Sequence, residues 1–190
     1  MGKSEHNGVA PIREDGRNLI EVHVAGACIR PVNGRWKLLA AKRTAKRSLF
    51  PGKWECGGGQ VRRGEDFVSA IKRQIFEEFG LDVVPYQIVE EYSIHIPGQQ
   101  SVIPGLRWLC IASAGKVRLN EREFSQYRWV DFPVPPKLDW IGGLVETLNG
   151  LRLPPPEAFY APADAISDTQ TPPAKPPGSI RPGFVSNVAS

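Results

Sequence analysis

The sequence has few of the features that mark membrane, secreted or disulfide-rich proteins. Among its 190 residues, no apolar run approaches the roughly 20 that a membrane-spanning helix needs. Residues 1–18 are polar and lack the apolar segment of a secretory signal. The three cysteines (Cys28, Cys56 and Cys110) are odd in number and widely spaced, which argues against a disulfide framework and against paired zinc ligands. We therefore expect a reduced, cytoplasmic protein that places no segment in a membrane.

Charge of one sign is also scarce. The chain has 24 Lys+Arg and 20 Asp+Glu, which gives a formal net charge of +4. This mild positive excess is compatible with a ligand that bears phosphate, whereas a nucleic-acid-binding surface usually needs a larger and more concentrated charge. The charge balance thus favours a small phosphate-bearing partner over a nucleic acid.

Proline is unevenly distributed, because half of the 18 prolines lie between Pro154 and Pro182. That stretch has no helix or strand periodicity, so we do not expect it to join a packed core. We predict a flexible N-terminal arm at 1–18, a folded domain at 19–152 and a proline-rich disordered tail at 153–190. The proline runs of the tail would also suit an extended peptide that docks to a partner domain, but an inert tail is the preferred interpretation.

The folded domain mixes predicted strands and helices, which indicates an α/β fold. Alternating and β-branched residues predict strands at 19–30 and 35–43, joined by an Asn33-Gly34 turn. A basic loop follows, and a short strand at 54–56 then leads into three glycines at 57–59. Further strand-like stretches cover 81–96 and 106–113, and helices are predicted at 66–79 and 138–151.

The first predicted helix has the clearest signals at both ends and along one face. Asp66 is a suitable N-cap and Gly80 is placed to end the helix. Apolar residues recur every three or four positions and predict the inward face: Val68, Ile71, Ile75 and Phe79.

The opposite side of this helix bears Gln74, Glu77 and Glu78. These positions are three and four apart, so we expect their side chains to converge on one patch of surface. Two adjacent carboxylates suit a hard divalent cation such as Mg²⁺ or Mn²⁺. A solvated acidic helix face is the simpler alternative for these three residues alone.

The spacing of residues around this patch matches a longer frame, G-x5-E-x7-R-[E]-U-x-E-E-x-G-U, where U is bulky and apolar. The residues that fit it are Gly59, Glu65, Arg73, Glu77, Glu78 and Gly80, together with apolar Ile75 and Leu81. In this frame the sequence resembles the Nudix hydrolase family over its signature box, here residues 59–81. The resemblance extends over about residues 19–150 and implies an α/β/α sandwich with a mixed β-sheet and a catalytic loop-helix.

The resemblance also implies a reaction and roles for these residues. Family members use a divalent cation, Mg²⁺ or Mn²⁺, and metal-activated water to cleave a diphosphate linkage in a nucleoside diphosphate joined to another group. The implied metal ligands are the carbonyl oxygen of Gly59 and the carboxylates of Glu77 and Glu78. Arg73 is expected to orient neighbouring groups, and Glu65 to pair with Arg73 or to reach the metal through water.

One position departs from the family pattern, because Gln74 stands where the box normally has a glutamate. In well-studied members that residue is a metal ligand, a general base or both, and a glutamine cannot accept a proton at neutral pH. Family members are known to supply a glutamate from a later loop. Glu123 has the matching spacing before Trp129 and is our candidate for the replacement base; a solvated loop glutamate is the alternative.

Positive and aromatic residues near the box are candidates for substrate contacts. Arg43, at the end of the second strand, is the predicted phosphate contact. The other basic residues of this region, Lys42, Lys46 and Arg47, are expected to be solvated. Trp36, Phe50 and Trp54 include candidates for stacking on a base, although aromatic residues more often belong to the core.

Two functions from different classes remain open. The first is a metal-dependent Nudix hydrolase that acts on a nucleotide-derived small molecule. Its specific substrate is open, although Gln60, where enzymes that cleanse oxidised dGTP commonly have lysine, makes that branch less favoured. The second is a Nudix-like domain that binds a nucleotide as a sensor or scaffold with little turnover, which Gln74 would explain. A homodimer is one state that the sequence allows.

Overall fold

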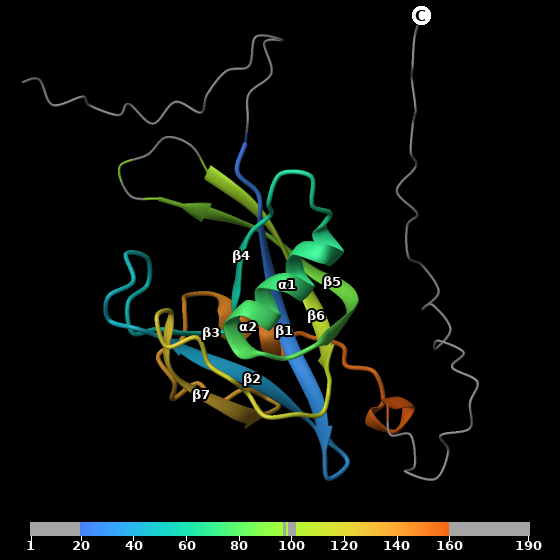
Figure 1. Ribbon diagram of the computed structural model, residues 1–190. Coiled ribbons are helices and arrows are strands. Elements are labelled where there is room, and N and C mark those ends of the chain that lie inside the picture. The colour runs from blue at the N-terminus through green and yellow to red at the C-terminus, as the bar shows by residue number, and fades with distance from the viewer. Residues whose placement is uncertain (1–19, 97, 99–101, 160–190) are drawn as a thin grey trace, which may run out of the picture. The chain divides into compact units, whose positions relative to one another are not determined.

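The computed structural model describes residues 20–96, 98 and 102–159 (Figure 1). Over these residues it has seven strands, two α-helices and one 3-10 helix. The strands are β1 (His23–Val32), β2 (Arg35–Arg43), β3 (Trp54–Glu55), β4 (Gly58–Gln60), β5 (Val83–His95), β6 (Val102–Ala112) and β7 (Phe124–Asp131). The helices are α1 (Phe67–Phe79), α2 (Leu144–Asn149) and the 3-10 helix η1 (Pro156–Phe159). No helix within these residues is long and apolar enough to cross a membrane.

The strands form one mixed sheet, as predicted. Its main order is β3-β2-β1-β6-β5, while β4 pairs with β1 and β7 pairs with β2. The β1–β6 pair is parallel and the other pairs are antiparallel. In Figure 1, β1 (blue) passes through the middle of the sheet, between β2 and β6. The expected hairpin between β1 and β2 is present, with Asn33 and Gly34 at positive φ as a two-residue turn of this kind requires.

Each face of the sheet is covered by one helix, which produces three layers. Alternate strand residues point to opposite faces, and the buried side chains accordingly form two clusters. On one face Val24, Cys28 and Leu39 pack with residues of α1. On the other, Ala27 and Leu38 belong to the cluster of α2. The arrangement is therefore an α/β/α sandwich.

The first helix follows its sequence signals closely. Asp66 is the N-cap and its side chain accepts a hydrogen bond from the Ser69 N–H at 2.6 Å; Gly80 adopts the left-handed conformation and ends the helix. Ile71, Ile75 and Phe79 are fully buried, as predicted. The prediction for Val68 is wrong, because this residue lies in the first turn and is exposed.

The second helix is shorter than the predicted 138–151, because the preceding segment makes long-range backbone bonds instead of helical ones. The Trp54 N–H donates to the Asp139 carbonyl at 2.9 Å, and the Ile141 N–H donates to the Trp54 carbonyl at 3.0 Å. Gly143, with φ of 79°, is the N-cap of α2. These contacts join the loop 138–141 to β3, so the helix begins only at Leu144.

The chain does not leave the domain at residue 153, where the predicted tail begins. The Trp36 Nε1 donates to the Pro154 carbonyl at 2.6 Å, and the ring of Phe159 packs edge-on against those of Trp36 and Tyr86. Residues 153–159 thus belong with the sheet on the α2 face. The predicted arm at 1–18 and the rest of the predicted tail lie outside the described residues, and their disorder stays a prediction.

Candidate active site

The glycine run before the helix lets the end of α1 approach the sheet closely. Gly57 has a φ of 87°, and a Cβ at this position would lie within 3.0 Å of both Glu78 Oε2 and the Phe79 ring. Any other residue would therefore push the helix away. The next residue, Gly58, donates its backbone N–H to Glu78 Oε2 at 2.9 Å. A glutamate near the end of α1 is thus held against the strand that carries the glycines.

Glu78 is buried, which differs from the predicted surface patch. Only 2% of the residue is exposed, and it is the one charged residue among the described ones that is fully buried. It shares the inward side of α1 with Ile75 and Phe79, whereas Glu77 points outward. The prediction that Glu78 lies on a surface patch with Gln74 and Glu77 is therefore wrong, because Glu78 lies on the buried side of α1, against Gly57 and Gly58.

Two further carboxylates act on Glu78. Burial raises the pKa of Glu78 well above its ordinary value, and the carboxylates of Glu55 and Glu123 raise it further. The Gly58 N–H and the Arg43 guanidinium oppose this rise only in part. We call Glu55, Glu78, Glu123 and Arg43 the inner cluster. Its excess of negative charge is the main electrostatic feature of the site.

Glu123 reaches the inner cluster because its loop is bonded to both neighbouring elements. The Asn120 N–H donates to the Glu78 carbonyl at 2.8 Å, and the Thr44 N–H donates to the Glu123 carbonyl at 2.9 Å. The Glu123 carboxylate accepts a hydrogen bond from Asn120 Nδ2 at 3.3 Å and lies 3.5 Å from Arg47 Nη1. The Glu123 carboxylate, the candidate replacement base, thus acts electrostatically on Glu78, and Arg47, expected to be solvated, pairs with it instead.

Glu55 was missed by the sequence analysis, which took it only as part of the segment leading into the glycines. Its carboxylate forms an ion pair with Arg43, and both side chains are largely buried. Arg43 also donates from Nε to the Leu49 carbonyl at 2.8 Å. The available signal was a charged residue in a short strand directly before Cys56 and the glycines, where a buried position is expected. Arg43 itself, the predicted phosphate contact, lies beside Glu78 but is bonded to groups of this chain.

The remaining box residues form a separate, outer network of Arg62, Glu65, Arg73 and Glu77. Arg73 donates to both oxygens of Glu65 at 2.7 Å and to Glu77 Oε2 at 3.1 Å. Arg62 Nη2 donates to Glu77 Oε1 at 3.0 Å. The hydrogen bonds from Arg73 are the largest cause that lowers the pKa of Glu65 to about 2. The Glu65–Arg73 pair, one of the two arrangements expected for Glu65, is therefore present.

Gln74 belongs with the outer network. Its Nε2 donates to the Gln60 carbonyl at 3.2 Å, an oxygen that also accepts from Arg73 at 3.0 Å. Its amide also covers Gly59, where a Cβ would fall within 3.0 Å of it. Gln74 and Glu77 thus do not converge with Glu78 as predicted, because each has polar partners on the outer side of α1.

The donor chemistry of the inner cluster fits a divalent cation. Glu55 and Glu123 both act electrostatically on the buried Glu78, and this excess of negative charge is what hard cations such as Mg²⁺ neutralise through oxygen ligands. Over the part of the chain that the structure describes, no three His, Cys, Asp or Glu side chains are already arranged as a metal site. Glu77, an implied ligand, would have to leave Arg62 and Arg73 to reach the cluster.

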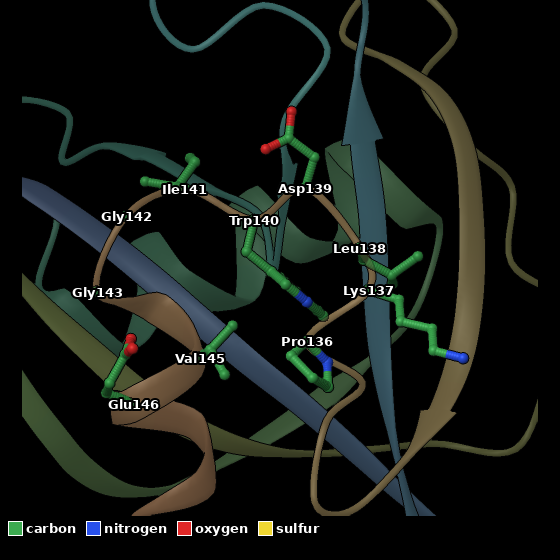
Figure 2. A pocket seen from close by; sticks show the side chains of 10 residues that line it. All are labelled: Pro136, Lys137, Leu138, Asp139, Trp140, Ile141, Gly142, Gly143, Val145 and Glu146. Atoms are coloured by element: carbon green, nitrogen blue, oxygen red, sulfur yellow. The ribbon is translucent and has the colours of Figure 1, made fainter.

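The aromatic residues proposed as candidates for stacking on a base differ in their exposure. Trp36 and Trp54 are buried in the core on the α2 face, whereas Phe50 is 43% exposed. An open hollow of about 440 Å³ is lined by residues 136–143, 145 and 146, and Figure 2 shows these lining residues, Trp140 among them. None of the inner-cluster residues lines this hollow.

Comparison with known proteins identifies the family of this chain. The family model described as NUDIX domain matches residues 22–143. The chain belongs to the Nudix hydrolase family. The box resemblance noted in the sequence is thereby confirmed, and so is the predicted enzyme class.

Relatives of known name and solved structures agree with this Nudix assignment. The nucleoside triphosphatase NudI of Escherichia coli O139:H28 is 30% identical over 101 residues, 48% of this chain and 71% of that protein. The putative 8-oxo-dGTP diphosphatase 2 of Mycobacterium tuberculosis H37Rv is 29% identical over 147 residues, 70% and 93% of the two chains.

Solved structures show the same fold. A MutT Nudix hydrolase from Burkholderia pseudomallei gives a TM-score of 0.58 at 20% identity, covering 71% of this chain and all of that one. A Caenorhabditis elegans Ap4A hydrolase gives 0.56 at 19% identity, covering 68% and 93%. The predicted Nudix α/β/α fold is thus confirmed.

Proposed function

We propose that this Nudix protein is a divalent-cation-dependent hydrolase that cleaves a diphosphate linkage in a nucleoside diphosphate joined to another group. The observation that carries the proposal is the buried Glu78 at the end of the box helix, on which Glu55 and Glu123 act electrostatically. Burial of like charges without a compensating cation is unfavourable. A fold that retains such a cluster is well suited to bind Mg²⁺ or Mn²⁺.

We assign the residues of the inner cluster to cation binding, proton transfer and phosphate binding. Glu78 would hold the cation, and the carbonyl of Gly59 and the carboxylate of Glu77 remain proposed ligands. When bound, the cation neutralises charge on the diphosphate and lowers the pKa of water. Glu123 would accept the proton of the attacking water, in the place of the family glutamate that Gln74 replaces. Arg43 would neutralise charge on the substrate phosphates.

The outer network would serve a supporting role. Arg73 joins the carboxylates of Glu65 and Glu77 and the carbonyl of Gln60, which ties the loop before α1 to the helix. Such a network fixes the orientation of the loop and of the groups that would bind the cation. Arg73 and Glu65 are therefore proposed as positioning residues.

Nucleoside triphosphates come first among candidate substrates, because NudI carries that activity in its name and the mycobacterial relative is named for 8-oxo-dGTP. Gln60, in place of the lysine common in enzymes for oxidised dGTP, disfavours the latter branch without excluding it. Dinucleotides and nucleotide sugars are the remaining candidate substrates.

A nucleotide sensor with little turnover is the second candidate. The observation that favours it is Gln74, whose amide is engaged with Gln60 on the outer side of the helix and carries no charge. If the site lacks a base, replacing Gln74 by Glu should raise the turnover number strongly. If Glu123 is the base, the same replacement should change it little.

The test is an activity panel on the purified protein. Canonical and oxidised nucleoside triphosphates, dinucleoside polyphosphates and nucleotide sugars are incubated with Mg²⁺ or Mn²⁺, and the nucleoside monophosphate and its co-product are quantified. The proposal expects turnover of at least one class that depends on the cation. Nucleotide binding without turnover in the whole panel would support the sensor instead.

A further inference from the structure

Both partners of the ion pair between Glu55 and Arg43 are largely buried. The exposed fractions of the two side chains are 16% for Glu55 and 12% for Arg43. The pair joins neighbouring strands, since Ala41 of β2 lies opposite Glu55 of β3. The backbone supports it, because the Arg43 N–H donates to the Lys53 carbonyl at 2.9 Å. An exposed ion pair contributes little to stability, whereas a buried pair fixes the position of both charges.

The ion pair with Glu55 holds Arg43 close enough to Glu78 to act on it electrostatically. Arg43 and Glu55 both act electrostatically on Glu78, from the α1 side of the sheet. Arg43 is held at two points, by Glu55 at Nη1 and by the Leu49 carbonyl at Nε. A guanidinium has further N–H donors, which can bind a phosphate while these two bonds persist.

Loss of the Glu55 charge would redirect Arg43. A buried guanidinium without a counter-ion is costly, so it takes another anion where one is near. The neighbouring anion is Glu78, the carboxylate that the proposed cation needs. A direct Arg43–Glu78 pair would occupy both the phosphate-binding and the cation-binding group. The bond to Glu55 would prevent this pairing.

We propose that Glu55 is a positioning residue that acts through Arg43 and holds its guanidinium where it binds the phosphates of the nucleotide substrate. The inference rests on the proposed function for the identity of the ligand, a nucleoside polyphosphate. It goes beyond that function by assigning a task to a residue that lies outside the Nudix box.

The experiment measures binding of a non-hydrolysable α,β-methylene nucleoside triphosphate to the full chain by calorimetry, with Mg²⁺ present. Glu55→Gln keeps the shape and an acceptor oxygen but removes the charge, and it should weaken binding by about tenfold or more. Glu55→Asp keeps the charge and should recover part of the affinity. Arg43→Gln should weaken binding at least as much, and the double variant should bind no more weakly than Arg43→Gln alone.

A matched control is available on the other face of the sheet. Glu90 also forms a largely buried pair with an arginine, Arg107, at 2.5 Å, and it accepts a hydrogen bond from Thr147 of α2. Glu90→Gln removes a comparable buried ion pair away from Glu78, and it should leave nucleotide affinity within about twofold of wild type.

The outcomes separate this inference from the proposed function. Unchanged binding by Glu55→Gln, equal weakening by Glu90→Gln, or losses that multiply in the double variant would each overturn the inference, as would a wild-type protein that binds no analogue. Absence of turnover in the activity panel, with the binding pattern as expected, would overturn the hydrolase proposal alone.

Discussion

At the scale of single residues, Glu78 determines the character of the site because it combines burial with proximity to other carboxylates. A buried acid whose pKa is raised holds its proton more tightly in the folded than in the unfolded chain. Stability from this group is therefore lost as pH rises above the ordinary glutamate pKa. The fold tolerates this cost at neutral pH, which is typical of residues kept for function rather than for stability.

This cost predicts that Glu78→Gln stabilises the protein when no divalent cation is present. The amide keeps an acceptor for the Gly58 N–H and has no charge to bury, so we expect a gain of about 1 kcal/mol, or about 2–4 °C in Tm, at neutral pH. The gain should shrink as pH falls toward the ordinary pKa of glutamate. Thermal unfolding at several pH values measures it, and a lower Tm for the variant at neutral pH would contradict the electrostatic description.

Glu123 is the residue on which the proton transfer depends. Glu123→Gln should lower kcat by about 10²–10⁴-fold while leaving KM within a few-fold, since the amide cannot accept a proton. Steady-state kinetics on the preferred substrate give both constants. A variant that keeps wild-type kcat would show that Glu123 is only a loop residue paired with Arg47.

At the scale of elements, local sequence signals predicted the bounds of α1 well, whereas long-range contacts determine where α2 begins. Asp66, Gly80 and the apolar spacing lie within the helix or at its ends, so the sequence alone contained them. The start of α2 depends on backbone bonds between the loop 138–141 and Trp54, far away in the sequence. The spacing of apolar residues in a sequence cannot show that a segment will bond to a distant strand instead of continuing a helix.

Part of the candidate site was likewise predictable from the sequence, and part of it depends on the fold. The family frame located Glu78 and the outer residues Glu65 and Arg73, and the spacing before Trp129 pointed to Glu123. The inward direction of Glu78 and the membership of Glu55 were not predictable, because they depend on the close contact between Gly57 and the end of α1.

That contact gives a prediction with an internal control. Gly57 and Gly64 both have positive φ, but a Cβ at Gly64 meets nothing within 4 Å, whereas one at Gly57 collides with Glu78 and Phe79. Gly64→Ala should cost about 1 kcal/mol of stability from backbone strain alone. Gly57→Ala should cost at least about 2 kcal/mol more and reduce activity. Urea unfolding compares the two, and equal losses would contradict the described contact.

At the scale of the whole molecule, the sheet separates two differently built faces. The inner cluster lies on the α1 face, while the α2 face is closed by apolar packing and by residues 153–159. The proline count alone suggested that the domain ends near residue 152. The folded domain instead extends to Phe159, because the ring of this residue packs against Trp36 and Tyr86.

The extent of the domain can be tested by truncation. A chain that ends at Phe159 should be more stable than one that ends at Arg152 by at least about 1.5 kcal/mol, because the shorter chain loses the aromatic contacts and the bond from Trp36 to Pro154. Thermal unfolding should show a difference of roughly 3–6 °C in Tm. Equal Tm values would mean that residues 153–159 contribute nothing to the domain.

The central claim is that cation-dependent hydrolysis depends on the buried Glu78, and the most direct measurement is the kcat of Glu78→Gln with saturating Mg²⁺ on the best substrate of the panel. We predict a loss of about 10³-fold or more, with a Tm no lower than that of wild type and with near wild-type activity for Glu90→Gln. A Glu78→Gln protein that keeps kcat within about tenfold of wild type would contradict the claim.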